Sequence, residues 1–325
     1  MLRYLIPLCA ALALVPGQLF AQTYPERRIT VLTSFGPGGG TDFLARIVGQ
    51  KLGERWSQPV AVESRMGGNG IIGARAAAKS NPDGYTLYVG SSNHMVLLPA
   101  MYDNLPFDPL KDFIPVIPIG SQPIVLALHP SVPASSVADF VALAKYRPGQ
   151  LNYAVVGIGS LEHLVGTLFE ARTGTQLVYV PYKSSGDAVA ALLGGQGVSM
   201  MFASSVSVAP HVKTGRLKAI VSTAPKRSSA LPDVPTGAES GLSDFVAFTW
   251  NGMFAPAGTP PEVVTKLHAE LVNILSMPDV VQRLSAAGVE PMGGTMGAFS
   301  ALIGSEIQRW RQVLKDSRIE VPKLN

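Results

Sequence analysis

A glycine-rich segment, Phe35-Gly36-Pro37-Gly38-Gly39-Gly40-Thr41-Asp42, has the composition of a loop that binds an anion. Glycine lets the backbone approach a ligand closely, and the free N–H groups and the dipole of a following helix favour negative charge. The segment lacks the Gly-Lys-Ser/Thr of a P-loop, and Thr41 stands where a dinucleotide-binding pattern needs its third glycine. On the motif alone, an anion site and a plain tight turn, with Thr41 or Asp42 capping the helix, explain it equally well.

Similar loops follow three more expected strands. They are Gly90-Ser91-Ser92-Asn93, Gly157-Ile158-Gly159-Ser160 with His163 one turn further on, and Tyr182-Lys183-Ser184-Ser185. Ligands of open α/β sheets bind beyond the carboxyl ends of strands, and amides and hydroxyls can hold a carboxylate without a counter-charge. A single serine of this kind is more often a turn residue, but repetition at four strand ends favours one shared cleft.

Catalytic and metal-binding patterns are weak. Ser160 and His163 lack an acid to complete a triad, since Glu162 is expected to point elsewhere, and Asp187 fits the first turn of a helix. No G-x-S-x-G elbow occurs. We therefore expect neither an enzyme nor a bound metal or cofactor. The histidines, none with H-x-x-x-H spacing, are His94, His129, His163, His211 and His268.

The elements that would position these loops alternate between short β-rich runs and helical patterns, which predicts an α/β fold. Extended segments are expected at 114–119 and 123–129, and C-terminal helices from Pro260-Pro261 and over 296–315. The expected strands are 29–33, 60–63, 85–89, 152–156, 177–180, 198–202 and 217–223, and the other helices are 42–52, 71–79, 139–145, 161–173, 187–193 and 206–214.

Two β-α series are visible, over 29–120 and 125–223. Crossovers between them are expected at Ile119-Gly120-Ser121-Gln122 and Thr249-Trp250-Asn251-Gly252. Two crossovers would make a hinge and a cleft between lobes. We expect a first lobe of residues 22–121 plus 250–325 and a second lobe of 122–249.

The first 21 residues read as a cleavable secretory signal, with Arg3, an apolar run and a cleavage site after Ala21. The single cysteine, Cys9, lies inside this segment after Leu8, where a lipoprotein signal would have a small residue. A mature chain without cysteine has no disulfide, which favours a bacterial periplasm over a eukaryotic secretory route.

Composition excludes other classes of protein. Of the 325 residues, 47% are hydrophobic and 15% charged, as in a globular protein. The net charge of +4 comes from scattered basic residues, so nucleic acid is not an expected partner. No stretch after the signal approaches the length of a membrane-spanning helix.

Taken together, the motifs resemble the Bug/TctC family, extracytoplasmic receptors of tripartite tricarboxylate transporters. The resemblance implies a two-lobed periplasmic-binding-protein fold, type II-like, which closes on a small carboxylate for separately encoded membrane subunits. A sensor that presents the ligand to a histidine-kinase ectodomain would share this fold. The matching segments include the loop from Phe35 to Asp42, Pro82 to Leu87, Asn152 to His163, Val180 to Lys183, Leu192 to Gln196, Leu231 to Thr236 and Phe254 to Pro260.

In the family, the first loop and the loop of Gly157 to Ser160 grip the ligand carboxylate, and ordered waters often bridge it to the first loop. Many members have Asp after Met-Phe to meet a ligand amino group, whereas Ala203 follows Met201-Phe202 here. This departure favours a dicarboxylate, a keto or hydroxy acid or an aromatic acid over an amino acid. The expected ligand-binding residues are Phe35, Gly36, Pro37, Gly38, Gly39, Gly40, Asp42, Ser91, Ser92, Gly157, Gly159, Ser160, His163, Tyr182, Ser184, Ala203 and Ser204.

Overall fold

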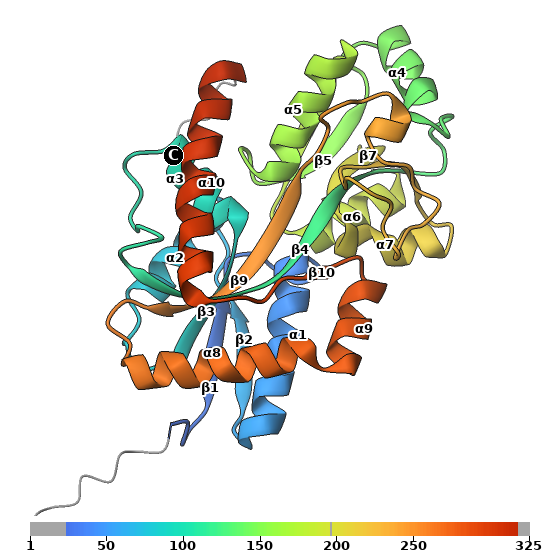
Figure 1. Ribbon diagram of the computed structural model, residues 1–325. Helices are drawn as coiled ribbons and strands as arrows, with labels where there is room; N and C mark the ends of the chain where they lie inside the picture. The colour runs from blue at the N-terminus through green and yellow to red at the C-terminus, as the bar shows by residue number, and fades with distance from the viewer. Residues whose placement is uncertain (1–23, 196, 318–325) are drawn as a thin grey trace, which may run out of the picture.

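The computed structural model describes residues 24–195 and 197–317, and these form one continuous ten-stranded sheet with helices around it (Figure 1). The strand order is β2-β1-β3-β9-β4-β7-β5-β6, with β8 and β10 also paired to β4. The expected α/β fold is thus confirmed. The signal segment 1–21 lies outside the described residues. No helix in the described ranges is long and apolar enough to cross a membrane.

The first lobe contains three parallel strands with β1 in the middle. The core beneath α1 is mainly aliphatic, with Leu44, Val48 and Leu52 on one side of α1 buried against β1 and β3, and a second cluster of the lobe is rich in aromatic side chains. This side is the apolar stripe that predicted the helix. The elements are β1 (Ile29–Thr33), α1 (Gly40–Trp56), β2 (Val60–Ser64), η1 (Gly68–Gly70), α2 (Ile71–Ala78), β3 (Thr86–Ser91), η2 (Asn93–Leu97) and α3 (Leu98–Met101).

The second lobe repeats this β-α pattern. Strands β5, β6 and β7 are parallel, and buried Phe140, Phe169, Phe202 and Phe245 form its aromatic core. The elements are α4 (Val137–Tyr146), β5 (Asn152–Val156), α5 (Leu161–Thr173), β6 (Val178–Tyr182), α6 (Ser185–Gly194), β7 (Met200–Ser204), α7 (Ser205–Lys213), β8 (Lys218–Ser222) and η3 (Ala238–Ser240).

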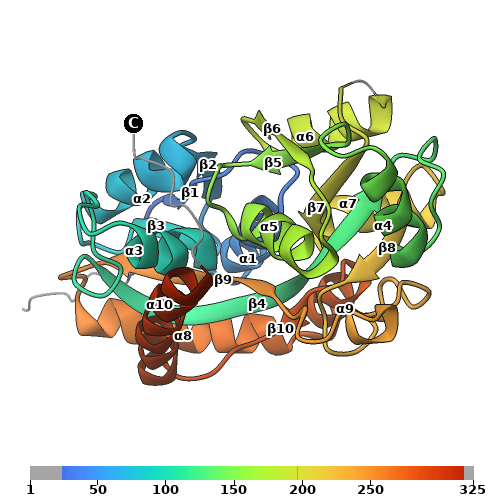
Figure 2. The same cartoon turned by 90° about the horizontal axis from the view of Figure 1, so that it is seen from above.

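Two long antiparallel strands, β4 (Phe113–Leu128) and β9 (Phe248–Pro256), run from one lobe into the other (Figures 1 and 2). The two extended segments expected at 114–119 and 123–129 are one strand. Its register with β9 shifts beside Pro115 and Pro118, because proline has no N–H for the ladder. The two expected crossovers lie opposite each other, with Ser121 paired to Trp250.

The C-terminal segment returns to the first lobe. Helix α8 (Pro261–Ser276) packs on α1, and α10 (Met296–Ser317) packs on η2 and α3 (Figure 2). Helix α9 (Pro278–Ala286) and the short β10 (Glu290–Pro291), which the sequence analysis did not predict, lie between them. Helices α8 and α9 each have a proline in their first turn, where its missing N–H costs nothing.

Candidate functional site

A small cavity of about 30 Å³, here called the inner cavity, lies between the lobes against β4 and β9. It has room for one or two water molecules, so a solute with several heavy atoms enters only if the lobes move apart. The first lobe contributes Phe35, Gly39, Gly40, Thr41, Ser91 and Asn93 to its wall, the second lobe Val156, Glu162, Ser185 and Ser204, and the long strands Gln122 and Thr249.

The glycine-rich loop reaches this cavity through Gly39 and Gly40. A Cβ on Gly40 would overlap the side-chain amide of Gln122, and one on Gly39 would lie 3.0 Å from Ser185 Oγ in the second lobe. Gly38 has φ +86° and accepts a hydrogen bond from Ser207 Oγ (3.2 Å), again from the second lobe. The loop therefore contacts the opposite lobe closely, which side chains at these positions would prevent.

The prediction that Thr41 or Asp42 caps α1 with its side chain is wrong. Gly39 is the N-cap and no side chain caps the helix. Thr41 instead donates to Asn251 Oδ1 (2.7 Å), and Asp42 pairs with Arg46 one turn further on (2.9 Å). The first-turn amides of α1 are left without intrahelical partners at the inner cavity. Asp42, an expected ligand-binding residue, lines a different pocket on the outside of α1.

Asn93, after β3, connects the two lobes. Its Oδ1 accepts from the backbone N–H of Leu161 (2.9 Å), and its Nδ2 donates to Glu162 Oε2 (3.3 Å). Ser91 lines the inner cavity, and Ser92 is buried beside it. A second link is the bond from Asn69 Nδ2 to the carbonyl of Ile158 (3.1 Å). These bonds join the two lobes beside the inner cavity.

The loop before α5 is held by its own residues. Ser160 is buried and caps α5 by accepting from the N–H of His163 (3.3 Å). The His163 ring stacks edge-on against Tyr179, and its Nδ1 accepts from the N–H of Gly159 (3.1 Å). Burial lowers the pKa of His163, which favours the neutral ring that this bond requires. His163 thus positions the loop and does not line the inner cavity.

Several buried polar atoms around the inner cavity have no hydrogen-bond partner among the described residues. They include Gln122 Oε1 and Thr249 Oγ1 in its wall and Ser92 Oγ nearby. An unpaired buried polar atom costs about 1–3 kcal/mol, so such groups normally meet a water or a ligand. The two in the wall make the inner cavity the candidate binding site.

Glu162 is the titratable side chain in the described wall of this cavity. The sequence analysis expected Glu162 to point away from Ser160 and His163, but its carboxyl accepts a hydrogen bond from Ser160 and lines the cavity. Burial raises the pKa of its carboxyl, against hydrogen bonds from its own backbone amide, Asn93 and Ser160 that lower it. The wall contains no Lys or Arg.

A larger outer pocket of about 390 Å³ lies next to the inner cavity. The two share Phe35 and Val156, which therefore stand between them. The outer pocket is lined by the glycine-rich turn 66–70, Gly157, Tyr182 and Lys183, together with Ser34. An elongated solute that reaches past Phe35 would extend into this space.

The remaining expected ligand-binding residues take other places. Gly36 packs against Ser184, which caps α6 through Asp187, and Pro37 is exposed. Ala203 is buried in the apolar core of the second lobe, whereas its neighbour Ser204 lines the inner cavity. Seven residues of the wall were not among the expected ligand-binding residues: Thr41, Asn93, Gln122, Val156, Glu162, Ser185 and Thr249. The signal for Gln122 and Thr249 was a polar residue inside each crossover.

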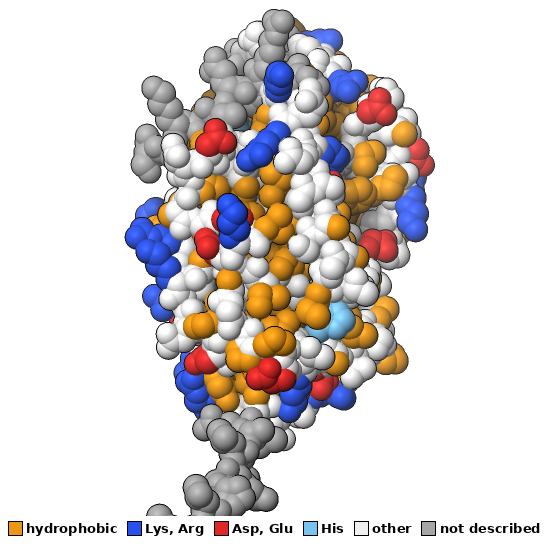
Figure 3. All heavy atoms as spheres, turned by 60° about the vertical axis from the view of Figure 1, so that its left-hand side comes forward, with side chains coloured by type: hydrophobic (Ala, Val, Ile, Leu, Met, Phe, Trp, Pro, Cys, Tyr) orange, Lys and Arg blue, Asp and Glu red, His pale blue; other side chains and the backbone are white. Residues whose placement is uncertain are grey.

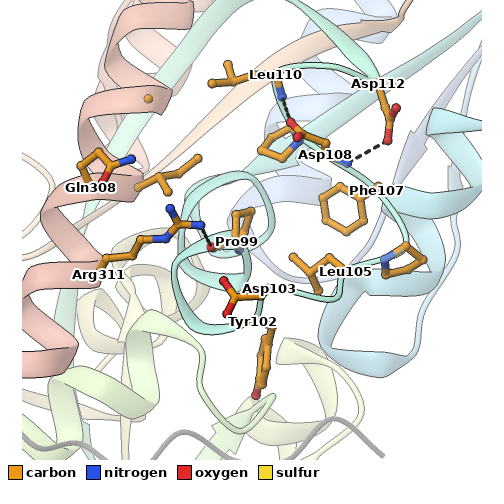
Figure 4. A pocket seen from close by; sticks show the side chains of 14 residues that line it. Pro99, Tyr102, Asp103, Leu105, Phe107, Asp108, Leu110, Asp112, Gln308 and Arg311 are labelled. Atoms are coloured by element: carbon orange, nitrogen blue, oxygen red, sulfur yellow. Dashed lines mark hydrogen bonds between the residues drawn. The ribbon is translucent and has the colours of Figure 1, made fainter.

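A larger pocket, of about 590 Å³, lies between the 99–112 segment and α10 (Figure 4). Three of its polar side chains bond to neighbouring backbone groups. Arg311 donates to the carbonyl of Pro99 (3.0 Å), Asp112 accepts from the N–H of Asp108 (2.8 Å), and Asp108 accepts from the N–H of Leu110 (2.9 Å). This pocket does not lie between the loops that follow the strands of the two lobes, as the inner cavity does.

The surface gives no competing charged site on the face of Figure 3. Lys and Arg side chains are interspersed there with Asp and Glu, and apolar side chains lie between them. Within the described ranges, no three His, Cys, Asp or Glu side chains are grouped to hold a metal ion.

A sheet whose two long strands pass through both lobes, with loops of each lobe meeting at a cavity between them, defines a two-lobed solute-binding protein of the periplasmic type. The family model described as "Tripartite tricarboxylate transporter family receptor" matches residues 44–319. The chain belongs to this TctC family, which confirms the resemblance seen in the sequence. BugT of Bordetella pertussis is 37% identical over 308 residues, covering 94% of each chain.

Solved structures give the same result. A Rhodopseudomonas palustris protein with adipate is 34% identical with a TM-score of 0.86, covering 90% of this chain and 97% of that one. The periplasmic binding protein BugD is 30% identical, TM-score 0.87, covering 91% and 99%. MatC from Rhodopseudomonas palustris, with bound malate, is 32% identical, TM-score 0.83, covering 90% and 100%. The family is thus one of periplasmic solute-binding receptors and not a family of enzymes.

Proposed function

We propose that this chain is a receptor without enzymatic activity that captures a small carboxylate between its lobes and delivers it to the membrane subunits of a tripartite tricarboxylate transporter. The observation that carries the proposal is the inner cavity. Glycine amides of the first lobe and partnerless buried oxygens of β4 and β9 surround it. Such neutral groups, at the positive end of α1, suit an anion.

The β4–β9 ribbon is the proposed hinge. It joins a first lobe of residues 22–121 plus 250–325 to a second lobe of 122–249, and Gln122 and Thr249 stand opposite each other in it. Bending here opens the inner cavity, and the hydrogen bonds of Asn93 to Leu161 and Glu162 re-form on closing. A ligand shifts the lobes to the closed state because it contacts both only there.

The proposed ligand is a dicarboxylate, a keto or hydroxy acid or an aromatic acid. One carboxylate lies in the inner cavity, held by the loops of Gly39-Gly40 and Ser91, and the rest of the molecule occupies the outer pocket near Tyr182 and Lys183. Lys183 would meet a second carboxylate there. The adipate and malate bound by two relatives support this class of ligand.

We propose export to the periplasm by a signal that is cleaved after Ala21. Expression of the full chain in a Gram-negative host, fractionation and N-terminal sequencing test this directly. A mature N-terminus at Gln22 in the periplasmic fraction is expected. An uncleaved cytoplasmic product would contradict the proposal.

Calorimetry of the purified chain against adipate, malate, benzoate, glutamate and aspartate tests the ligand class. We expect one site, no product formation and closure seen as a smaller radius of gyration in solution scattering. Tight binding of glutamate or aspartate, with none of the non-amino acids, would overturn the ligand class. Binding of no acid at millimolar concentration would overturn the receptor proposal itself.

A further inference from the structure

We propose that Glu162 is a ligand-binding residue that carries a proton in the closed complex and donates it, as a hydrogen bond, to the carboxylate of the bound acid. The inference rests on the proposed function and deepens it: each captured carboxylate would bring one proton into the site. Glu162 Oε and the ligand carboxylate would then share that proton, and no covalent bond other than O–H changes.

Geometry is the first argument. Glu162 lies in the wall of the inner cavity together with Gly40, Thr41 and Gln122, the groups proposed to hold the acid. The cavity is so small that any carboxylate inside it lies beside this side chain. Two carboxylates in such a site cannot both be ionised without a cation between them, so one of the two must hold a proton.

The second argument is the absence of a compensating cation in the described wall, which contains no Lys or Arg. The nearest titratable groups on the surrounding elements do not supply one. His163 and His94 both have pKa values lowered by burial, Asp42 is paired with Arg46, Asp187 is bonded to Ser184, and Lys183 lines the outer pocket.

The Leu161 N–H fixes the orientation of the Asn93 amide relative to Glu162. The Oδ1 of Asn93 is occupied by the N–H of Leu161, so its Nδ2 must face the carboxyl and donate to Oε2. Besides this bond, the carboxyl accepts from its own backbone amide and from Ser160. A carboxyl has about four acceptor positions, so one remains to carry the proton. Burial raises the pKa of Glu162, which supports protonation once the lobes close. In an open protein the same carboxyl meets water and ionises near its ordinary value, so closing on a ligand takes up a proton.

Calorimetry of the whole protein with adipate, malate and benzoate, in buffers of different ionisation enthalpy near pH 7.5, measures this uptake. These acids are fully ionised there, and we expect uptake of about one proton per ligand and a Kd that rises up to about tenfold per pH unit. The variant Glu162→Gln has an amide that donates without titrating. Its proton uptake should vanish, and it should bind more tightly than the wild type above neutral pH, by a margin about tenfold larger at pH 8.5 than at pH 7.5.

The matched control is Glu170→Gln, on the same helix but outside the cavity, where the carboxyl accepts from the N–H of Leu177 (2.6 Å). It should keep the proton uptake of the wild type. Stoichiometric carboxylate binding by the wild type without proton uptake would overturn this inference and leave the receptor function standing. A loss of affinity in Glu162→Gln together with tight binding of glutamate or aspartate would show an ionised Glu162 that meets an ammonium group, which also overturns it. If no carboxylate binds, both proposals fail.

Discussion

Gln122 on β4 and Thr249 on β9 stand opposite each other in the antiparallel ladder, and each has a buried oxygen at the inner cavity with no partner in the part of the chain that the structure describes. The two strands that join the lobes thus also carry polar groups of the candidate site. A bend of this ribbon would move both oxygens relative to the loops of either lobe. Capture of a ligand and movement of the hinge are therefore coupled through these two residues.

Thr249→Val tests whether the unpaired hydroxyl of Thr249 hydrogen-bonds to the ligand. Removing an unpaired buried hydroxyl should raise the free energy of unfolding of the ligand-free protein by about 1 kcal/mol and weaken carboxylate binding about tenfold. Denaturant unfolding and calorimetry measure the two effects. The control is Thr223→Val, whose hydroxyl bonds to both backbone groups of Ile124 and to the carbonyl of Ala247; it should lose about 1–3 kcal/mol. Equal destabilisation by both variants would contradict the prediction.

Gly40→Ala tests the close approach of the glycine-rich loop to β4. The new methyl overlaps the Gln122 side chain and should drive it from the cavity wall, lowering affinity for the bound acid at least about tenfold. In the same helix, a Cβ on Gly49 would lie at ordinary contact distances, 3.4 Å from Val60 and 3.5 Å from Val62. Gly49→Ala should keep the affinity and raise stability by about 0.5–1 kcal/mol. Unchanged binding in Gly40→Ala would show that Gln122 is not needed at the site.

Asn93→Ala removes the side chain that bonds to Leu161 and Glu162 across the lobes. Two hydrogen bonds of the closed state are lost and none of the open state, so affinity should fall about tenfold or more, mainly through faster release of the ligand. Stopped-flow displacement measures the release rate. Asn273→Ala, on the exposed side of α8, is the control. An unchanged release rate in Asn93→Ala would argue against its role as a latch.

Lys183→Met tests the proposed second carboxylate in the outer pocket. Because the side chain is exposed, an ion pair there is worth about 0.2–1 kcal/mol, a loss of roughly fivefold or less. We expect this loss for adipate but not for a monocarboxylate such as benzoate, by calorimetry at low salt. Lys145→Met, exposed near the end of α4, should change neither affinity. Equal losses for both acids would exclude a specific contact.

His94 predicts how stability depends on pH. Its ring is fully buried against Tyr88 and Phe35, and burial lowers its pKa from 6.5 to about 3. The unfolded chain therefore binds a proton between these values and the folded protein does not. The contribution of the neutral, buried His94 to the free energy of unfolding is fully present above pH 6.5. It is lost as the pH falls towards about 3, by at most about 1.4 kcal/mol per pH unit. His94→Gln should show a shallower loss in urea unfolding at several pH values, and parallel curves for variant and wild type would contradict this.

The sequence by itself determined the local elements. The period of apolar residues predicted α1 over Leu44, Val48 and Leu52, the bounds of α5 agree with its prediction, and α/β alternation gave the fold class. Glycine and serine after each strand indicated the loops, because local conformational freedom and free helix amides depend on neighbouring residues alone. Phe35, Gly39, Gly40, Ser91 and Ser204 from those loops line the inner cavity.

Only the tertiary structure decided which side chains meet. Asn93 and Glu162 are 69 residues apart, and their contact depends on how two lobes close on each other, which no local pattern encodes. The same holds for Gln122 and Thr249, which become neighbours through the register of β4 and β9. Asp42 and His163 were chosen from the motifs, but each bonds to a residue four positions away in the sequence. Asp42 pairs with Arg46, and His163 accepts from the N–H of Gly159. Side chains contact the groups that the fold brings close in space, and distance along the sequence does not determine which groups these are.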